Sequence, residues 1–202
     1  MLILGLTGGI ATGKGVVAST WSQAPGVRVV DADPLVHALY RRESPIHQQL
    51  VEAFGPTILD GEGGINRKAL GKLVFQDESA RRTLNAIVHP AVRAQYARLA
   101  QEALAQGVAV FVVEAALLLD SQPDHSFFNA FVTTDLDEQE QLRRLMARDG
   151  LSSEAALSRI RAQLPRALRR KRADYALDTS GSMEQTQARA RELLARIERE
   201  LG

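Results

Sequence analysis

Residues 8–15 read Gly-Gly-Ile-Ala-Thr-Gly-Lys-Gly and match the spacing G-x-x-x-x-G-K of a phosphate-binding loop. The loop follows the apolar run at residues 2–6 and precedes a stretch with helical character. We expect the glycines at 8, 9 and 13 to adopt positive φ, which turns backbone N–H groups toward a polyphosphate. Lys14 would oppose the helix dipole unless an anion lies in front of it. The pattern predicts nucleotide binding.

Gly15 is the unusual position of this loop, because a Ser or Thr normally follows the lysine and places its hydroxyl on Mg²⁺. The sequence offers two replacements for that ligand. A water molecule could occupy the position, since Mg²⁺ keeps several waters in most protein sites, or Thr12 could turn toward the metal. We favour water.

Length and hydrophobic patterning predict an α/β fold. The chain has 202 residues, and candidate strands at 2–6, 27–30, 108–113, 128–133 and 175–177 alternate with helical patterns. Each crossover is long enough to join parallel strands. We therefore expect a parallel sheet of about five strands flanked by helices.

We expect a single domain over residues 1–202 that has three parts. These parts are a core (1–42, 91–148 and 173–202), a helical insert (43–90) and a basic lid (149–172). Proline and glycine break the insert into short pieces, and we expect separate helices before and after Pro90. An insert of this kind beside a nucleotide site often carries the second substrate.

Composition excludes several function classes. The formal net charge is +1 and the chain has no cysteine, so neither strong attraction to nucleic acid nor a disulfide framework is indicated. The longest apolar run, residues 108–119, contains Glu114 and is too short to span a bilayer. No basic segment or cleavage site precedes Gly5. We expect a cytoplasmic protein, a monomer or weak homo-oligomer, that binds neither nucleic acid nor membrane.

Two carboxylates, Asp31 and Asp33, follow the second candidate strand, where ligand sites of open α/β sheets lie. Asp33 is the candidate reactive group. An equally good reading makes it a helix N-cap, with Pro34 at the first helical position. His37 lies on the same helical face, although a lone histidine there is more typical of packing or hydrogen bonding.

Glu114 ends the third candidate strand and could either hold a metal-bound water or face solvent. Arg144 and Arg148 lie one helical turn apart and precede the basic lid. They could form a solvated face. We favour a phosphate-binding role, because a polyphosphate needs charge neutralisation and a lid that closes could supply it.

Taken together, the motifs resemble the dephospho-CoA kinase family of the P-loop kinase superfamily. The resemblance runs nearly end to end and rests on Leu-Thr-Gly-Gly-Ile-x-x-Gly-Lys from Leu6, Asp31-Ala32-Asp33, Val88-His89-Pro90, Glu114 with Leu117-Leu118, Arg148-Asp149-Gly150-Leu151-Ser152, Gln163-x-Pro165 and Arg172-Ala173-Asp174.

The resemblance implies transfer of the γ-phosphoryl group of ATP, with Mg²⁺, to the ribose 3′-hydroxyl of dephospho-CoA, the last step of CoA biosynthesis. Asp33 matches the general base, and Lys14 and Arg148 complete the catalytic set. ATP-binding positions are implied at Gly9, Ile10, Ala11, Thr12, Gly13, Lys14, Gly15, Val16, Arg144 and Arg148. Acceptor-binding positions are implied at Asp33, His37, His89 and Arg93, and Glu114 would reach the metal through water.

Four departures from the family pattern stand at Gly15 for Ser, Val16 for Thr, Ala116 for Pro and Thr179 for Asn. Two alternatives stay open: another small-molecule or nucleoside kinase of the same fold, or a nucleotide-binding protein whose catalysis is weakened by Gly15. Nucleic-acid binding through residues 159–172 is disfavoured, because the basic run lacks interleaved aromatic residues.

Overall fold

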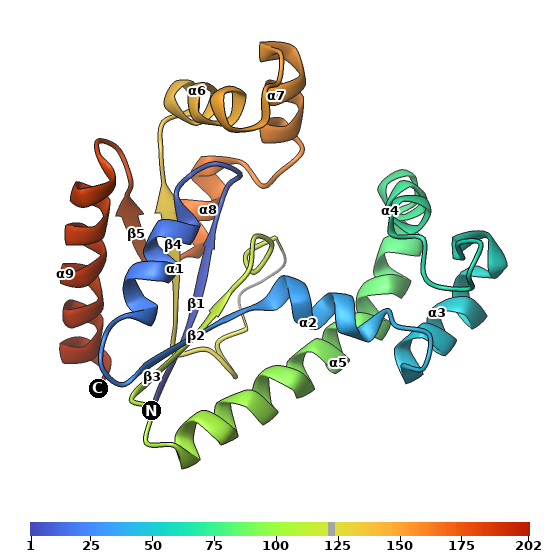
Figure 1. The fold of residues 1–202 in the computed structure, drawn as a ribbon, viewed down its shortest axis with the longest axis horizontal. Coiled ribbons are helices and arrows are strands. Elements are labelled where there is room, and N and C mark those ends of the chain that lie inside the picture. Colours follow the sequence, from blue (N-terminus) through green and yellow to red (C-terminus); the bar gives the residue numbers. More distant parts are fainter. Residues whose placement is uncertain (121–123) are drawn as a thin grey trace. The chain divides into compact units, whose positions relative to one another are not determined.

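A five-stranded sheet organises the computed structural model, which describes residues 1–120 and 124–202 (Figure 1). Its strands are β1 (Leu2–Gly8), β2 (Val27–Asp31), β3 (Val110–Glu114), β4 (Ala130–Asp135) and β5 (Tyr175–Asp178). Their order is β2-β3-β1-β4-β5, and β1 pairs in parallel with both β3 and β4. The predicted α/β fold with a parallel sheet of about five strands is confirmed.

The register brings the ends of three strands to one edge of this sheet. Leu6 lies opposite Glu114, and Gly8 lies opposite Thr134. The loop that follows β1 therefore starts beside the last residues of β3 and β4, as expected for the ligand-binding edge of a parallel sheet.

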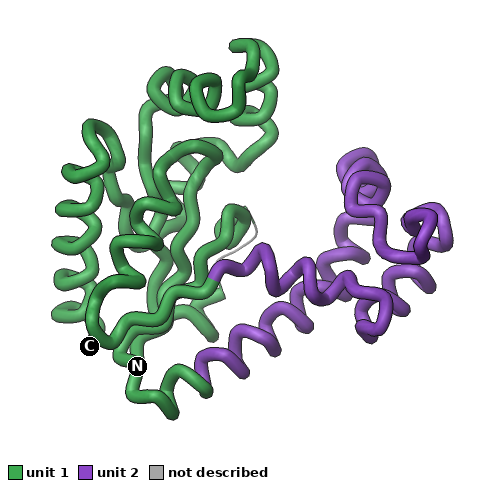
Figure 2. The backbone as a smooth tube through the Cα atoms, in the orientation of Figure 1, with its two compact units in different colours: residues 1–30, 102–202 green, residues 31–101 purple. Residues whose placement is uncertain are grey.

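The chain forms two compact units, residues 1–30 with 102–202 and residues 31–101 (Figure 2). The first contains the sheet and the helices α1 (Lys14–Ser22), α6 (Glu138–Asp149), α7 (Ser153–Arg161), α8 (Arg166–Arg172) and α9 (Met183–Leu201). Helices α1 and α9 pack together in the main core. Trp21 is fully buried there, and its indole N–H donates to the Ala190 carbonyl at 2.7 Å.

The second unit has its own apolar core. Its elements are α2 (Ala32–Leu39), α3 (Pro45–Phe54), the 3-10 turn η1 (Pro56–Ile58), α4 (Arg67–Gln76) and most of α5 (Glu78–Ala105). Ile46, Leu50, Ile58 and Val88 are buried together within it. The predicted insert, residues 43–90, lies inside this unit.

Helix α5 corrects one sequence prediction, because it continues through Pro90 instead of dividing there. Proline removes one N–H donor and crowds the preceding turn. Val88 before it and Leu99 after it are both buried, so packing on either side outweighs this local cost. Neither α5 nor any other helix in the described residues combines the length and apolarity needed to cross a membrane.

Candidate active site

The loop between β1 and α1 has two residues with left-handed backbone conformation. Gly13, the N-cap of α1, has φ of 83°, and Ala11 has φ of 57°. Ala11 is the one non-glycine residue in the described chain with positive φ. A Cβ makes this conformation unfavourable, so the surrounding contacts must hold Ala11 in place.

Gly8 and Gly9 are required for a different reason from the one predicted, because neither has positive φ. They are small because other residues pack against them. A Cβ on Gly8 would overlap the Thr134 hydroxyl, and one on Gly9 would lie 2.8 Å from side-chain nitrogens of Arg169 and Gln141. Their role is close packing of the loop onto β4 and the helices that follow it.

Five backbone N–H groups of the loop and first helical turn have no acceptor among residues 1–120 and 124–202. They belong to Gly9, Ala11, Gly13, Lys14 and Gly15. Unpaired N–H groups at a helix N-terminus carry partial positive charge and are a ready site for an anion. The arrangement suits a phosphate group.

Ile10 and Thr12 use their N–H groups within the protein. The N–H of Ile10 donates to the Gln163 side chain at 2.7 Å, and that of Thr12 donates to the Gly9 carbonyl at 3.2 Å. The buried Thr12 hydroxyl is also engaged, at 2.7 Å from the Gly9 carbonyl and 2.6 Å from the Thr134 hydroxyl. These contacts disfavour the alternative in which Thr12 replaces the missing metal ligand.

Lys14 forms an ion pair with Glu114, whose carboxylate oxygen lies 2.5 Å from the lysine nitrogen. Their side chains are 21% and 15% exposed, so the pair is only partly screened by solvent. The sequence predicted that the Glu114 side chain would either hold a metal-bound water or face solvent. Its contact with Lys14 places the carboxylate directly at the predicted phosphate site.

The position of Gly15 is open to solvent, and a Cβ built there meets no atom within 4 Å. A side chain would therefore fit. Val16 next to it is half-buried, and its N–H donates to the Gly13 carbonyl at 3.0 Å. The missing hydroxyl reflects the residue type at 15 and not a lack of space.

Arg144 and Arg148 both project from α6 but hold different partners. Arg144 contacts Glu140 at 2.7 Å and the Gly181 carbonyl at 3.2 Å. Arg148, which is 56% exposed, pairs with Asp149 at 2.7 Å. The structure thus brings Lys14 and Glu114 together, but it gives Arg144 and Arg148 partners outside the loop.

Asp135 at the end of β4 is a site residue that the sequence analysis missed. Arg166 contacts its two carboxylate oxygens at 2.6 and 3.0 Å, and Arg170 contacts it at 2.9 Å. The hydrogen bond from Arg166 holds the pKa of Asp135 below its ordinary value. Asp135 therefore ties α8, which lies in the segment predicted as a lid, to the sheet. Its position at the carboxyl end of a strand was the signal that could have identified it.

Gln141 and Thr179 were also not predicted as site residues. Gln141 donates to the Ile10 carbonyl at 2.8 Å, and the Thr179 hydroxyl donates to the Thr12 carbonyl at 2.7 Å. Both side chains are buried. Thr179 was noticeable only as a departure from the family pattern, and nothing in the sequence distinguished Gln141.

In the second unit, the structure overturns the helix-cap reading of Asp33. The N-cap of α2 is Asp31, whose carboxylate accepts from the Asp33 N–H at 3.0 Å. Asp33 itself is exposed in the first turn. Burial and the charges of Asp33 and Asp31 raise the pKa of the neighbouring Tyr96 to about 12. Tyr96 therefore stays protonated beside Asp33.

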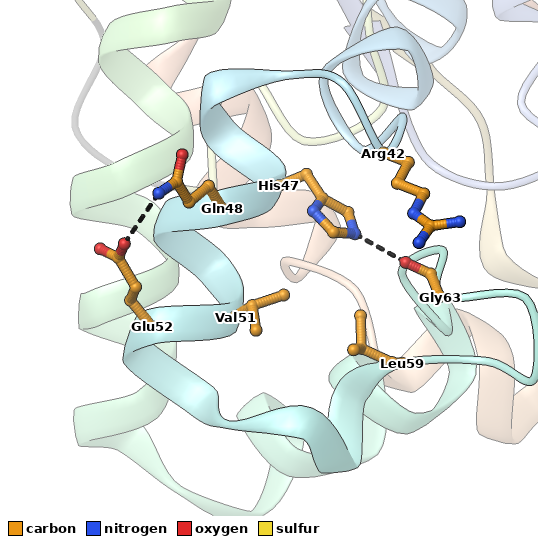
Figure 3. A pocket seen from close by; sticks show the side chains of 7 residues that line it. All are labelled: Arg42, His47, Gln48, Val51, Glu52, Leu59 and Gly63. Atoms are coloured by element: carbon orange, nitrogen blue, oxygen red, sulfur yellow. Dashed lines mark hydrogen bonds between the residues drawn. The ribbon is translucent and has the colours of Figure 1, made fainter.

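The other predicted acceptor residues, His37, His89 and Arg93, are exposed on α2 and α5. The second unit also contains a cavity of about 410 Å³ (Figure 3). Its lining residues are Arg42, His47, Gln48, Val51, Glu52, Leu59 and Gly63, and none of the predicted acceptor residues is among these. Among the lining residues, His47 donates from Nε2 to the Gly63 carbonyl at 2.9 Å (Figure 3).

Relatives of known identity match the chain over nearly all of its length. A protein named dephospho-CoA kinase from Symbiobacterium thermophilum is 41% identical over 93% of this chain and 78% of its own. One of the same name from Syntrophotalea carbinolica is 42% identical over 98% of this chain and 92% of its own.

Solved structures also match the chain over nearly all of its length. A Thermus thermophilus protein, TT1252, has a TM-score of 0.76 and 33% identity, covering 100% of this chain and 98% of its own. The dephospho-CoA kinase from Campylobacter jejuni has a TM-score of 0.68 and 25% identity, covering 98% of each chain. The family model for dephospho-CoA kinase matches residues 2–185. With the loop, Lys14 and Asp33 in their expected sequence contexts, the chain belongs to the dephospho-CoA kinase family.

Proposed function

We propose that this protein transfers the γ-phosphoryl group of ATP to the ribose 3′-hydroxyl of dephospho-CoA, giving CoA and ADP. One structural observation carries the proposal: in this member of the dephospho-CoA kinase family, the loop that ends in Lys14 has backbone N–H groups with no acceptor in the described part of the chain. In phosphoryl transfer, catalysis consists largely of positioning and charge stabilisation, which such a loop supplies.

The triphosphate of ATP would be held by the loop and by Lys14. The N–H groups of Ala11, Gly13, Lys14 and Gly15 are available to phosphate oxygens, and the dipole of α1 adds to their field. Lys14 would exchange Glu114 for phosphate. Arg148 is exposed, and its present partner Asp149 is exchangeable, so it could add charge on the lid side.

Mg²⁺ fits the residues present as a phosphate-bound ion. Among the described residues, no group of three or more His, Cys, Asp or Glu side chains could hold a metal by itself. Glu114 offers a carboxylate at the loop, and Gly15 leaves room for water. Mg²⁺ commonly takes one or two carboxylates, substrate phosphates and several waters. Bound there, it would neutralise charge on the transferring phosphoryl group.

Asp33 would act as the general base toward the acceptor hydroxyl. Asp31 supplies the cap of α2, so the Asp33 carboxylate is not needed for that purpose. His37, His89 and Arg93 are exposed polar residues of the same unit and would contribute to acceptor binding. This assignment rests on the family motif and on the freedom of the Asp33 side chain.

A coupled ADP-release assay tests the proposal. The purified protein is incubated with Mg·ATP and dephospho-CoA, with adenosine and shikimate as control acceptors. We expect ADP release with dephospho-CoA alone, and a product with phosphate at the 3′ position. Preference for a control acceptor would indicate another kinase of this fold. ATP binding without ADP release over any acceptor would indicate a non-catalytic nucleotide-binding protein.

A further inference from the structure

Two carbonyl groups of the loop accept hydrogen bonds from buried side chains that are distant in the sequence. Gln141 on α6 donates to the Ile10 carbonyl at 2.8 Å, and Thr179 after β5 donates to the Thr12 carbonyl at 2.7 Å. Gln141 is 5% exposed and Thr179 is 0% exposed, so solvent does not compete for either bond.

Peptide geometry links each of these carbonyls to an N–H group. No described peptide bond is cis, and in a trans peptide the C=O and the N–H of the next residue point in opposite directions. Fixing the Ile10 carbonyl therefore fixes the Ala11 N–H, and fixing the Thr12 carbonyl fixes the Gly13 N–H. Both of these N–H groups lack an acceptor among residues 1–120 and 124–202.

We propose that Gln141 and Thr179 are positioning residues for the polyphosphate. By hydrogen bonding to the Ile10 carbonyl, Gln141 directs the Ala11 N–H toward the polyphosphate, and Thr179 does the same for the Gly13 N–H through the Thr12 carbonyl. The inference rests on the proposed nucleotide-binding role of the loop. It explains why the loop keeps its shape although Ala11 has an unfavourable φ of 57°.

Thr179 also fixes the loop relative to the sheet. Its hydroxyl lies 3.1 Å from the Asp135 carbonyl, and its N–H donates to the same carbonyl at 3.0 Å. One side chain therefore joins the end of β4 to the loop. The methyl group of Thr179 lies near Gly13 as well, 3.8 Å from where a Cβ would stand.

Variants at Thr179 separate hydrogen bonding from packing. Thr179→Val keeps the size of the side chain but replaces the hydroxyl by a methyl group, whereas Thr179→Ser keeps the hydroxyl and removes the methyl group. The binding of ADP and of inorganic tripolyphosphate is measured by calorimetry on the full chain. The KM values for ATP and dephospho-CoA and the melting temperature are measured in parallel.

We expect Thr179→Val to weaken both ligands by about tenfold, the usual effect of one lost hydrogen bond, and to raise the KM for ATP similarly. The KM for dephospho-CoA should stay within about twofold of the parent, as should ligand affinity in Thr179→Ser. Gln141→Met, which keeps an unbranched side chain without a donor, should repeat the loss.

Equal losses in Thr179→Val and Thr179→Ser would overturn the proposal for Thr179, as would a lower melting temperature with unchanged ligand affinity. Unchanged affinity in Gln141→Met would overturn it for Gln141. If Thr179→Val does not fold, the ligand affinity of Gln141→Met decides whether a hydrogen bond to a loop carbonyl positions the loop for binding. Because no acceptor is present in the binding experiments, an error in the proposed acceptor leaves these outcomes intact. Failure of the parent protein to bind ADP would instead contradict the proposed function.

Discussion

The ammonium group of Lys14 lies 2.5 Å from the carboxylate of Glu114, where the phosphate-binding loop meets the end of β3. A triphosphate that enters the loop must therefore displace a carboxylate from Lys14 and remain next to it. Mg²⁺ would relieve the repulsion between Glu114 and phosphate. Metal and nucleotide binding should be coupled through this pair.

The variant Glu114→Gln should uncouple metal binding from nucleotide binding. Without metal, ATP should bind about fivefold more tightly than to the parent, because one negative charge beside the phosphates is gone. With Mg²⁺, turnover should fall, because the carboxylate proposed to hold a metal-bound water is lost. Calorimetry in EDTA and steady-state assays in Mg²⁺ check the two effects. Glu154→Gln, an exposed site on α7, is the charge-matched control. Unchanged metal-free affinity in Glu114→Gln would argue against competition for Lys14.

Asp33→Asn should lower kcat by about 100-fold or more, since removal of a general base typically costs that much. The Kd for ATP should change by no more than about twofold, because Asp33 is not assigned to the nucleotide. Rapid-quench measurement of ADP formation together with calorimetry separates the two quantities.

The matched control for this variant is Asp31→Asn. Asparagine caps helices about as well as aspartate, so α2 should be retained and turnover should remain close to that of the parent. Equal loss of turnover in both variants would show that Asp33 has no special role as a base.

Gly15→Ser should lower the Mg²⁺ concentration for half-maximal rate by about threefold or more, because it adds a hydroxyl ligand for the metal. The structure accommodates the new side chain, since a Cβ at this position meets no atom within 4 Å. A magnesium titration at saturating ATP measures the effect. Gly15→Ala controls for the higher helix propensity of any residue other than glycine. Identical magnesium curves for Ser and Ala would mean that this position does not contact the metal.

Acid should weaken the ion pairs that join α8 to Asp135 of the sheet. The hydrogen bond from Arg166 lowers the folded-state pKa of Asp135 from 3.8, so its stabilising effect is complete above that value and is lost as the pH falls through the folded-state pKa. Urea unfolding at pH 7 and pH 3 should therefore show a smaller loss of stability in Asp135→Asn than in the parent. Glu154→Gln should lose as much stability as the parent. An equal loss of stability in Asp135→Asn would show that the ionised Asp135 carboxylate does not contribute to the pH dependence of stability.

Local sequence signals predicted the sheet, the loop and Lys14 because periodicity, glycine spacing and strand–loop–helix order act over a few residues. The same local reasoning failed at Pro90, where burial of residues on both sides keeps α5 continuous. It also assigned positive φ to Gly8 and Gly9, which are small only because other side chains pack against them.

The two residues that hold the loop carbonyls, Gln141 and Thr179, could not be predicted from the sequence. Gln141 lies 131 residues from Ile10, and Thr179 lies 167 residues from Thr12. A buried glutamine on a helix and a threonine after a strand have no distinctive spacing. Only the packed structure identifies them as contacts of the loop.

The same long separations have a consequence for synthesis on the ribosome. The loop after β1 is made before the side chains that hold it, because these come from α6 and from the turn after β5. A nascent chain that does not yet include Thr179 lacks the hydrogen bond from its hydroxyl to the Thr12 carbonyl. Full affinity for ATP should therefore emerge only after Thr179 has been made and has docked on the loop.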